Sequence, residues 1–451
     1  MMRGRHAPGL RRTRCVAMVC ALMVTLQARA AGEPAAASTL PIDLATSLRL
    51  AGAQNLDVQL ARNALEQARA GYTSALTSFV PALVPTASYL RHSGVGQAVG
   101  GSVVDASRRS TTLGAGLMLQ VPVGEATFAT LQNRQLVAAA DAAAKTEEQN
   151  STLTAARRYF DLVRAFAQTD VVTQALAVSE DYQRQLGEAV RIGIAFRGDL
   201  LRVETQSQRL QLDLARARQQ QTLASASLAQ ALHLDPLVRL VPAEAEPVPL
   251  ALADLNASAQ SLLKTALEQR PEVAQSHALV MAAEEARRGV LYGPLVPTLS
   301  AQAGRGHLSG GPLGEDRISG RANDVVFGLS WRIGPGGLFD PGRIRSSRFK
   351  VRAAELIEER QREAVSREVA DSHARVTSLF EQVRIARANI TSAAEALRLT
   401  RERKELGVGT VLEDIQAQQE LVKARSEYIV SVTELNQEQY ALQRATGSAL
   451  K

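Results

Sequence analysis

The residues able to catalyse a reaction or to bind a metal are few and far apart in this chain of 451 residues. No two histidines lie four positions apart, so no helix face offers a histidine pair to a metal ion. No glycine-rich loop follows a predicted strand as a phosphate-binding motif would. We therefore predict that the protein is not an enzyme, and we assign no catalytic residue, metal or cofactor. The histidines are His6, His92, His233, His277, His307 and His373.

The first 30 residues have the three parts of a secretory signal peptide. An arginine-rich beginning is followed by an apolar run over residues 15–26 and a small-x-small site at 28–30, which predicts cleavage before Ala31. Both cysteines lie inside this segment, and the second follows Val19, where a lipoprotein signal requires a small residue. The mature chain is therefore expected to leave the cytoplasm without a disulfide or a lipid anchor.

The net charge of +7 suggests nucleic acid as a partner until its position is considered. Six of the 52 basic residues belong to the signal segment, which contains no acid, so the rest of the chain has 46 basic and 45 acidic residues. A nearly neutral chain lacks the positive field that phosphate backbones require. We predict no nucleic-acid partner.

Two segments alternate between apolar and other residues with the period of a β-strand, over residues 112–121 and 325–332. Strands of about ten residues with one apolar face are typical of transmembrane barrels. Two amphipathic hairpins on a soluble body would give the same pattern, and this alternative stays open at this point. If the strands cross a membrane, we expect lipid to contact Leu117, Leu119, Phe327, Leu329 and Trp331.

Each alternating segment has a predicted partner strand before it, over residues 84–92 and 296–305, which alternates poorly. Between the partners, residues 93–111 and 306–323 are rich in glycine and serine and are expected to form long loops. Four strands cannot close a barrel, and an open sheet edge inside lipid is prohibitive. Several chains must then share one barrel.

The chain consists of one long unit that occurs twice. Leu83-Val84-Pro85-Thr86 recurs as Leu295-Val296-Pro297-Thr298, 212 positions later. Residues 125–186 and 343–406 contain neither glycine nor proline, and neither do the shorter segments 199–235 and 410–446. Each long segment could form a helix of roughly 90 to 100 Å, and each shorter one a helix that returns beside it.

The returning helix of the first unit is predicted to pack along one narrow seam. Its small and apolar residues are spaced alternately three and four apart, which is the pattern of a coiled coil. The seam includes Leu200, Val203, Ser207, Leu210 and Leu214.

Each unit opens with a further helical segment, 42–79 in the first and 261–292 in the second. A proline-rich stretch over residues 236–250 is expected to link the units. We therefore divide the chain into a signal peptide (1–30), a first repeat (31–236), a linker (237–260) and a second repeat (261–451).

The second unit carries three motifs that together, and in this order, resemble those of the TolC-like outer-membrane efflux proteins. They are Ala266-Leu267-Glu268-Gln269-Arg270-Pro271-Glu272-Val273, Pro294-Leu295-Val296-Pro297 and Leu338-Phe339-Asp340-Pro341-Gly342-Arg343. The resemblance covers nearly the whole mature chain. Pro341 departs from it, because that family often has a second glycine there.

The resemblance implies a mainly α fold with a membrane β-barrel portion. Duplicated units of long coiled helical hairpins, with two strands each, would assemble as a homotrimer into one β-barrel and an α-helical tunnel. Such a channel belongs to a tripartite efflux or type I secretion system and is a passive exit duct in contact with outer-membrane lipid. A periplasmic adaptor (membrane fusion protein) and an inner-membrane transporter are its expected partners.

The resemblance also implies two periplasmic sites. Adaptor-docking tips would lie at the hairpin turns, which hold Arg197, Gly198, Asp199, Gly407 and Gly409. An alternative is that the glycines only permit tight turns.

The second site is the periplasmic gate, for which the candidates are Glu413, Asp414 and Gln416. Gln416 stands where the family often has an aspartate. The two carboxylates would favour cations if they faced the pore. Alternatively they face solvent or pair with Arg401 and Arg403.

A periplasmic coiled-coil adaptor or scaffold is the other function class that this sequence allows. Adaptors also contain long helical hairpins, but with one hairpin between β-rich halves. The present chain has two predicted hairpins, each preceded by strands, which favours the channel.

Overall fold

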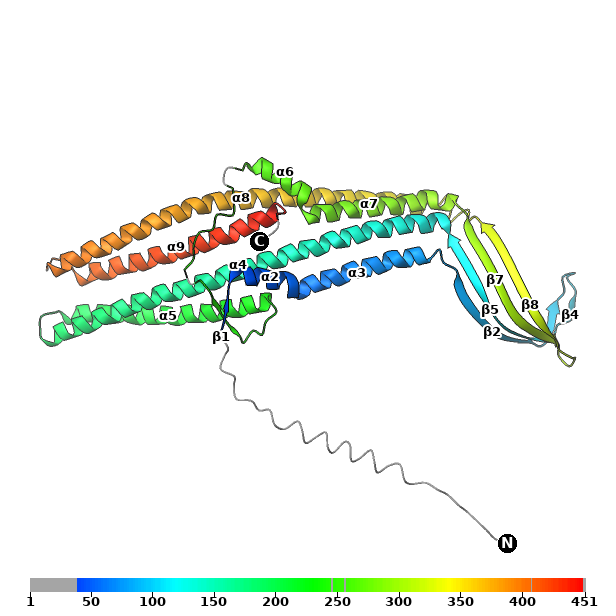
Figure 1. The fold of residues 1–451 in the computed structure, drawn as a ribbon, viewed down its shortest axis with the longest axis horizontal. Coiled ribbons are helices and arrows are strands. Elements are labelled where there is room, and N and C mark those ends of the chain that lie inside the picture. Colours follow the sequence, from blue (N-terminus) through cyan, green and yellow to red (C-terminus); the bar gives the residue numbers. More distant parts are fainter. Residues whose placement is uncertain (1–38, 245, 255–256, 407, 449–451) are drawn as a thin grey trace, which may run out of the picture.

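The computed structural model describes residues 39–448 except 245, 255–256 and 407, so the expected signal peptide lies outside the described residues. Long helices form an elongated body, and a curved sheet lies at one end of it (Figure 1). This arrangement confirms the predicted mainly helical fold with a small β portion.

The same order of elements occurs in both units, which confirms the predicted duplication. In the first unit the elements are α2 (Leu44–Gln54), α3 (Leu56–Thr77), β2 (Ala82–His92), β5 (Arg108–Pro122), α4 (Val123–Arg191) and α5 (Arg197–Ala231). In the second they are α6 (Ala259–Gln269), α7 (Pro271–Tyr292), β7 (Thr298–Pro312), β8 (Ile318–Ser330), α8 (Pro341–Glu405) and α9 (Val411–Ala445). A 3-10 turn, η1 (Gly293–Leu295), precedes β7.

The two rods α4 and α8 contain 69 and 65 residues, as the segments without glycine and proline predict. Each rod runs antiparallel beside its returning helix, α5 or α9 (Figure 1). The predicted seam of α5 is confirmed, because Val203, Ser207, Leu210 and Leu214 are all buried. A larger apolar cluster lies about halfway along the body, where Leu162 and other side chains of α4 pack against α2, α5 and β6 (Arg239–Pro242).

The opening helices are not continuous, contrary to the expectation for residues 42–79 and 261–292. Asn55 and Arg270 interrupt them with extended backbone dihedral angles. The Asn55 side chain accepts a hydrogen bond from the amide of Asp57 (2.7 Å) and so caps α3. Pro271 disfavours helical geometry at the residue before it, which explains the break at Arg270.

The break at Arg270 positions a buried cluster of charges. The Arg270 side chain is only 1% exposed, and its guanidinium donates to both carboxylate oxygens of Glu272 (2.9 and 3.1 Å) and to Glu368 on α8 (2.6 Å). Arg444 on α9 pairs with the same two acids and donates to Asn150 on α4 (2.7 Å). Burial opposes ionisation of Glu272, yet its two arginine neighbours hold its pKa below the usual value. This cluster joins four helices from both units.

The segment 236–250 connects the two units and contains β6, which pairs in parallel with β1 (Thr39–Ile42). One loop prediction is wrong. Residues 306–323 are mostly strand, since β7 continues to Pro312 and β8 begins at Ile318. Glycine- and serine-rich sequence can extend a strand where neighbouring strands supply the hydrogen bonds. The loop over 93–111 contains a small hairpin of β3 (Val95–Gln97) and β4 (Val103–Asp105).

The main sheet has the antiparallel order β2-β5-β7-β8. The two predicted strand pairs are confirmed, and the two units meet at the pairing of β5 with β7. In the described part of the chain, the outer edges of β2 and β8 have no partner strand.

Among the described residues, no helix has both the length and the apolar character needed to span a membrane.

We expect Arg270→Ala to lower the free energy of unfolding by about 3–5 kcal/mol, because Glu272 and Glu368 lose one of their two shared cations and Arg444 alone then faces both acids in the buried cluster. Urea unfolding followed by circular dichroism measures the change. Arg69→Ala is the control, since Arg69 pairs with Glu66 on an exposed surface and should cost less than about 1 kcal/mol. Equal losses in the two variants would contradict a structural role for the buried cluster.

Candidate functional site: the curved sheet and the helical tips

One face of the main sheet is a continuous apolar surface. The register aligns Leu117 with Leu83, Ala303 and Val325, and it aligns Leu119 with Ala301 and Phe327. Side chains of paired residues lie on the same face of a sheet. We call this the convex face, because the sheet bends away from it (Figure 1). In the single chain it is largely open to solvent, with Phe327 77% and Leu117 50% exposed.

The five residues predicted to contact lipid occupy this face, though not equally. Leu117, Phe327 and Leu329 are exposed, whereas Leu119 is half-buried. Trp331 lies just beyond the end of β8, is 52% exposed, and donates from Nε1 to the backbone oxygen of Leu295 (3.3 Å). Contact of these five side chains with lipid stays a prediction.

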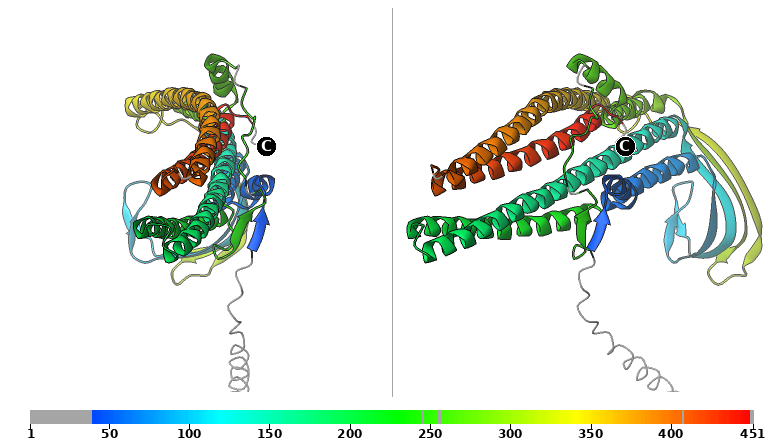
Figure 2. Two further views of the ribbon diagram at one scale, coloured as in Figure 1. Left: turned by 90° about the vertical axis from the view of Figure 1, so that its left-hand side faces the viewer. Right: turned by 60° about the vertical axis from the view of Figure 1, so that its left-hand side comes forward.

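The opposite, concave face is polar and contains small residues. Gln120, Ser300 and Gly328 form one of its rows. Gly114 and Gly306 lie opposite each other, and a Cβ on Gly114 would approach the Cα of Gly306 to 2.8 Å. Glycine therefore permits the close approach of β5 and β7 on the inside of the bend. Seen from its end, the helical body is also curved like a wall (Figure 2).

The hairpin turns lie at the end of the body farthest from the sheet, where Arg197, Gly198, Asp199 and Gly409 are found (Figure 1). Gly407 lies outside the described residues. Asp199 pairs with Arg202 (3.0 Å) on the same helix. An added Cβ at Gly409 would overlap the backbone of residues 403–404, so the turn itself requires this glycine, whereas a Cβ at Gly198 would meet only the exposed ring of Phe196.

Sequence reasoning missed the apolar side chains of these turns. Ile194 is 77% exposed, Leu406 79% and Val408 69%, and Ile192 and Phe196 are also exposed. The sequence did contain a signal for these exposed side chains, namely an apolar residue between the turn glycines Gly193 and Gly198. A turn this short cannot bury an apolar side chain.

The three gate candidates differ in their surroundings. Glu413 belongs to the capping box of α9, where the Thr410 hydroxyl accepts from the Glu413 amide (3.3 Å), and its carboxylate lies 3.9 Å from Arg403. Asp414 is buried and lies 3.7 Å from Arg401 and 3.6 Å from Lys404. Gln416 is exposed. The two carboxylates therefore pair with basic residues of α8, as in the alternative described above.

Lys404 connects Asp414 to the other hairpin. Its ammonium lies 3.5 Å from the centre of the Tyr182 ring on α4, a cation–π contact between the two units. Burial lowers the pKa of Lys404, and the charge of Asp414 opposes that shift. Burial, with a smaller contribution from Asp414, raises the pKa of Tyr182 to about 12. The Tyr182 side chain is therefore neutral at neutral pH. We call Tyr182, Lys404 and Asp414 the tip cluster.

The tip cluster was only partly visible in the sequence. The basic residues of 401–404 precede the turn by less than two helical turns, which indicated pairing with the acids after it. Tyr182 belongs to a different unit, and no local pattern connects it with Lys404. Among the described residues, no group of His, Cys, Asp and Glu could hold a metal ion.

Comparisons with known proteins agree with this geometry. Residues 262–448 match the family model described as outer membrane efflux protein. Protein CyaE of Bordetella pertussis is 27% identical over 268 residues, which cover 57% of this chain and 53% of CyaE, so the chain spans about half the length of this curated relative.

Solved structures share the fold at low sequence identity. A membrane protein from Pseudomonas aeruginosa superposes with a TM-score of 0.77 at 20% identity, over 90% of this chain and 93% of that one. The CmeC outer membrane channel of Campylobacter jejuni superposes with a TM-score of 0.77 at 16% identity, over 90% of this chain and 85% of that one.

Two long helical hairpins that continue into one curved, four-stranded sheet define a fold of outer-membrane channels. The chain therefore has the fold of the TolC-like outer-membrane channels, and its second unit matches the outer membrane efflux protein family.

We expect Leu117→Arg and Phe327→Arg to reduce the amount of assembled protein in the outer membrane, because a lipid-facing arginine costs about 2–4 kcal/mol at the bilayer midplane. Heat-resistant oligomer in outer-membrane fractions gives the measurement. The matched controls are Met118→Arg and Val326→Arg, whose exposed side chains occupy the concave face one residue away. If all four variants assemble equally, the convex face does not contact lipid.

Proposed function

We propose that the protein is the outer-membrane channel component of a tripartite efflux or type I secretion system, a passive exit duct for substrates that an inner-membrane transporter and a periplasmic adaptor deliver. The main observation in support is the sheet, which has an apolar convex face, a polar concave face and two unpaired edges. A sheet of this kind is one sector of a barrel with a polar interior.

We propose that three copies join edge to edge, as in the related family, to form a homotrimer with one barrel and one helical tunnel. Pairing of β8 with β2 of the next copy would provide hydrogen-bond partners for the backbone N–H and C=O groups at these edges, which lipid cannot provide. Transport would require no reaction by this chain, in keeping with the scattered histidines. Chemical cross-linking of membranes tests the stoichiometry, and a ladder that ends at three chains is the expected result.

A periplasmic adaptor or scaffold is the alternative function. An adaptor would appear as soluble protein in the periplasmic fraction, whereas a channel would appear as oligomer in the outer-membrane fraction and conduct ions after reconstitution. The exposed apolar side chains of the convex face, such as Phe327, favour the channel, since a water-soluble protein rarely exposes such a surface.

We further propose that the tip cluster holds the periplasmic end closed. Lys404 contacts Asp414 on its own hairpin and Tyr182 on the other, so it links the hairpins where the tunnel would narrow. Separation of the hairpins would break the cation–π contact. Glu413, Asp414 and Gln416 would then lie beside the opening.

Removal of the Lys404 charge should open this end. We expect Lys404→Met and Asp414→Asn to raise the single-channel conductance in planar bilayers several-fold, because each removes a charge from a partly desolvated contact. Arg403→Met is the control, since its pair with Glu413 is exposed and long (3.9 Å). A conductance equal to that of the unmodified protein would show that the tip cluster does not close the channel.

The carboxylates also determine selectivity in this proposal. We expect Glu413→Gln combined with Asp414→Asn to reduce cation selectivity and to weaken block by multivalent cations, because three copies of each acid would surround the opening. Reversal potentials in a salt gradient provide the measurement. An unchanged selectivity would place the narrowest point elsewhere.

We propose that the exposed apolar side chains of the turns bind the adaptor. A substitution at Gly409 cannot test this, since it would disturb the turn. We expect Ile194→Glu and Val408→Glu to reduce export about tenfold or more while trimers stay in the membrane, because an apolar contact would be lost and a charge desolvated. Leu237→Glu, at an exposed position halfway along the body, should leave export unchanged. Normal export by the turn variants would exclude these turns as the docking surface.

A further inference from the structure

Basic side chains gather on the convex face beyond its apolar part, at the end of the sheet that is farther from the helices. The register places Arg91 opposite Arg109, and His307 opposite Arg321, while Arg305 lies one row nearer the apolar surface. We call these five residues the convex basic cluster. All are exposed except Arg109, which is half-buried.

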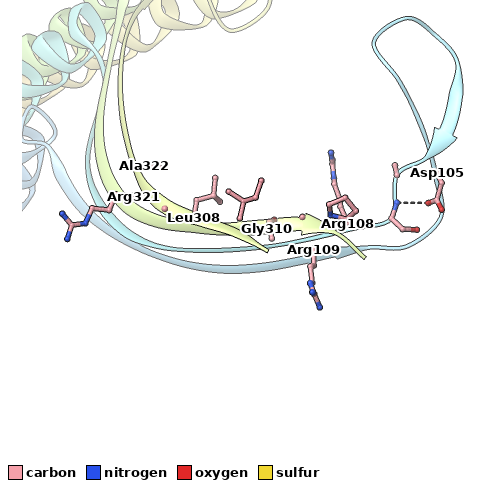
Figure 3. Close-up of a pocket in the computed structure, with 14 residues that line it drawn as sticks. Asp105, Arg108, Arg109, Leu308, Gly310, Arg321 and Ala322 are labelled. Atoms are coloured by element: carbon pink, nitrogen blue, oxygen red, sulfur yellow. Dashed lines mark hydrogen bonds between the residues drawn. The ribbon is translucent and has the colours of Figure 1, made fainter. Parts of the chain in front are cut away.

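The side chains of this cluster point away from the interior of the sheet. Figure 3 shows Arg109 and Arg321 on the convex side, whereas Arg108 and Leu308 project into the concave hollow. That hollow has a volume of about 620 Å³ and would be part of the channel interior. Arg109 and Arg305 belong to the inner strands β5 and β7, so copies that join at the outer edges would not cover them.

No protein acid neutralises the cluster in the described part of the chain. The convex positions of the four strands contain no Asp or Glu, since Asp324 of β8 occupies the concave face and Glu315 and Asp316 lie in the turn between β7 and β8. Arg109 donates to the backbone oxygen of Glu315 (3.5 Å), and its buried Nε has no partner. Like charges directly opposite each other destabilise a strand pair, as do charges on a lipid-facing surface. An anion from outside the protein, bound to these side chains, would reduce both the repulsion between like charges and the cost of placing charge next to lipid.

The position of the cluster identifies where that anion comes from. Ten residues separate Trp331 from Arg321 along β8, which correspond to roughly 33 Å along a strand and about 25 Å along the axis of a tilted barrel. That height equals the apolar thickness of such barrels, and interfacial aromatic residues flank it. Tyr89, 63% exposed, lies two residues from Arg91 on the same face. The cluster therefore lies at the headgroups of the outer leaflet.

We propose that the convex basic cluster is a binding site for the phosphate groups of an outer-leaflet glycolipid. Guanidinium groups form paired hydrogen bonds to phosphate, and these are strong where water is partly excluded. The acyl chains of the same lipid would cover the apolar surface around Leu117 and Phe327. This proposal rests on the outer-membrane location and is independent of what the channel transports.

The test uses the full-length oligomer in nanodiscs of phosphatidylcholine, to which bisphosphorylated lipid A is added. We expect the triple variant Arg109→Gln, Arg305→Gln and Arg321→Gln to bind lipid A at least about tenfold more weakly than the unmodified protein. Arg108→Gln is the matched control, because it removes the same charge one residue away on the concave face. Equal binding by the triple variant, or an equal loss in the control, would overturn the site.

Further measurements use the unmodified protein, so they test the proposed lipid site even if the triple variant fails to assemble. Bisphosphorylated lipid A should raise the melting temperature of the oligomer, whereas the dephosphorylated lipid should raise it clearly less. An equal rise with phosphatidylglycerol would overturn the assignment to a glycolipid. An equal rise with inorganic phosphate would reduce the cluster to a simple anion site and overturn the assignment to a lipid.

Discussion

The unpaired edges of the curved sheet are the constraint on which the rest of the structure depends. Inside a bilayer, each backbone N–H and C=O group without a hydrogen-bond partner costs several kcal/mol. Four antiparallel strands leave two such edges, on β2 and β8. Closure of a barrel by further copies of the chain would pair both edges. Such closure requires each sheet to bend, and the opposed glycines Gly114 and Gly306 permit that bend. The shape of one chain therefore fits the barrel that we propose several chains share.

The buried charges at Arg270 fix the packing of α7 against α8 and α9 in the helical body. A proline after Arg270 breaks the opening helix, and the freed arginine enters the space between α7, α8 and α9. Because Arg444 and Glu368 complete the cluster, rotation of α7 would leave charges buried without partners. The motif around Arg270-Pro271-Glu272 thus has a structural explanation.

Local patterns in the sequence predicted most of the elements. The segments without glycine and proline correspond to the rods, and alternation identified β5 and β8, because both signals depend only on neighbouring residues. The outer parts of β7 and β8 were missed, since their glycine- and serine-rich sequences do not alternate. The strand β6 was missed because four residues in a proline-rich stretch carry no period, and its partner β1 lies about 200 positions away in the sequence.

The functional residues were harder to predict because their roles depend on contacts between distant segments. Arginine illustrates this point. Arg398 forms short pairs with Glu395 and Glu402 on an exposed helix face, and such pairs contribute little to stability. Arg270 is equally well paired but fully buried, so its loss would affect the whole fold.

Arg109 differs from both, because it is half-buried on the convex face, whose positions in the four strands of the main sheet contain no acid. The three side chains have the same chemistry, and only burial and the available partners distinguish a surface group, a structural group and the group that we propose binds a phosphate. The sequence indicates the burial of a side chain only weakly, and it hardly indicates which partners are available to that side chain. Register determines both for Arg109, since a shift of one residue would move Arg108 to the convex face in place of Arg109.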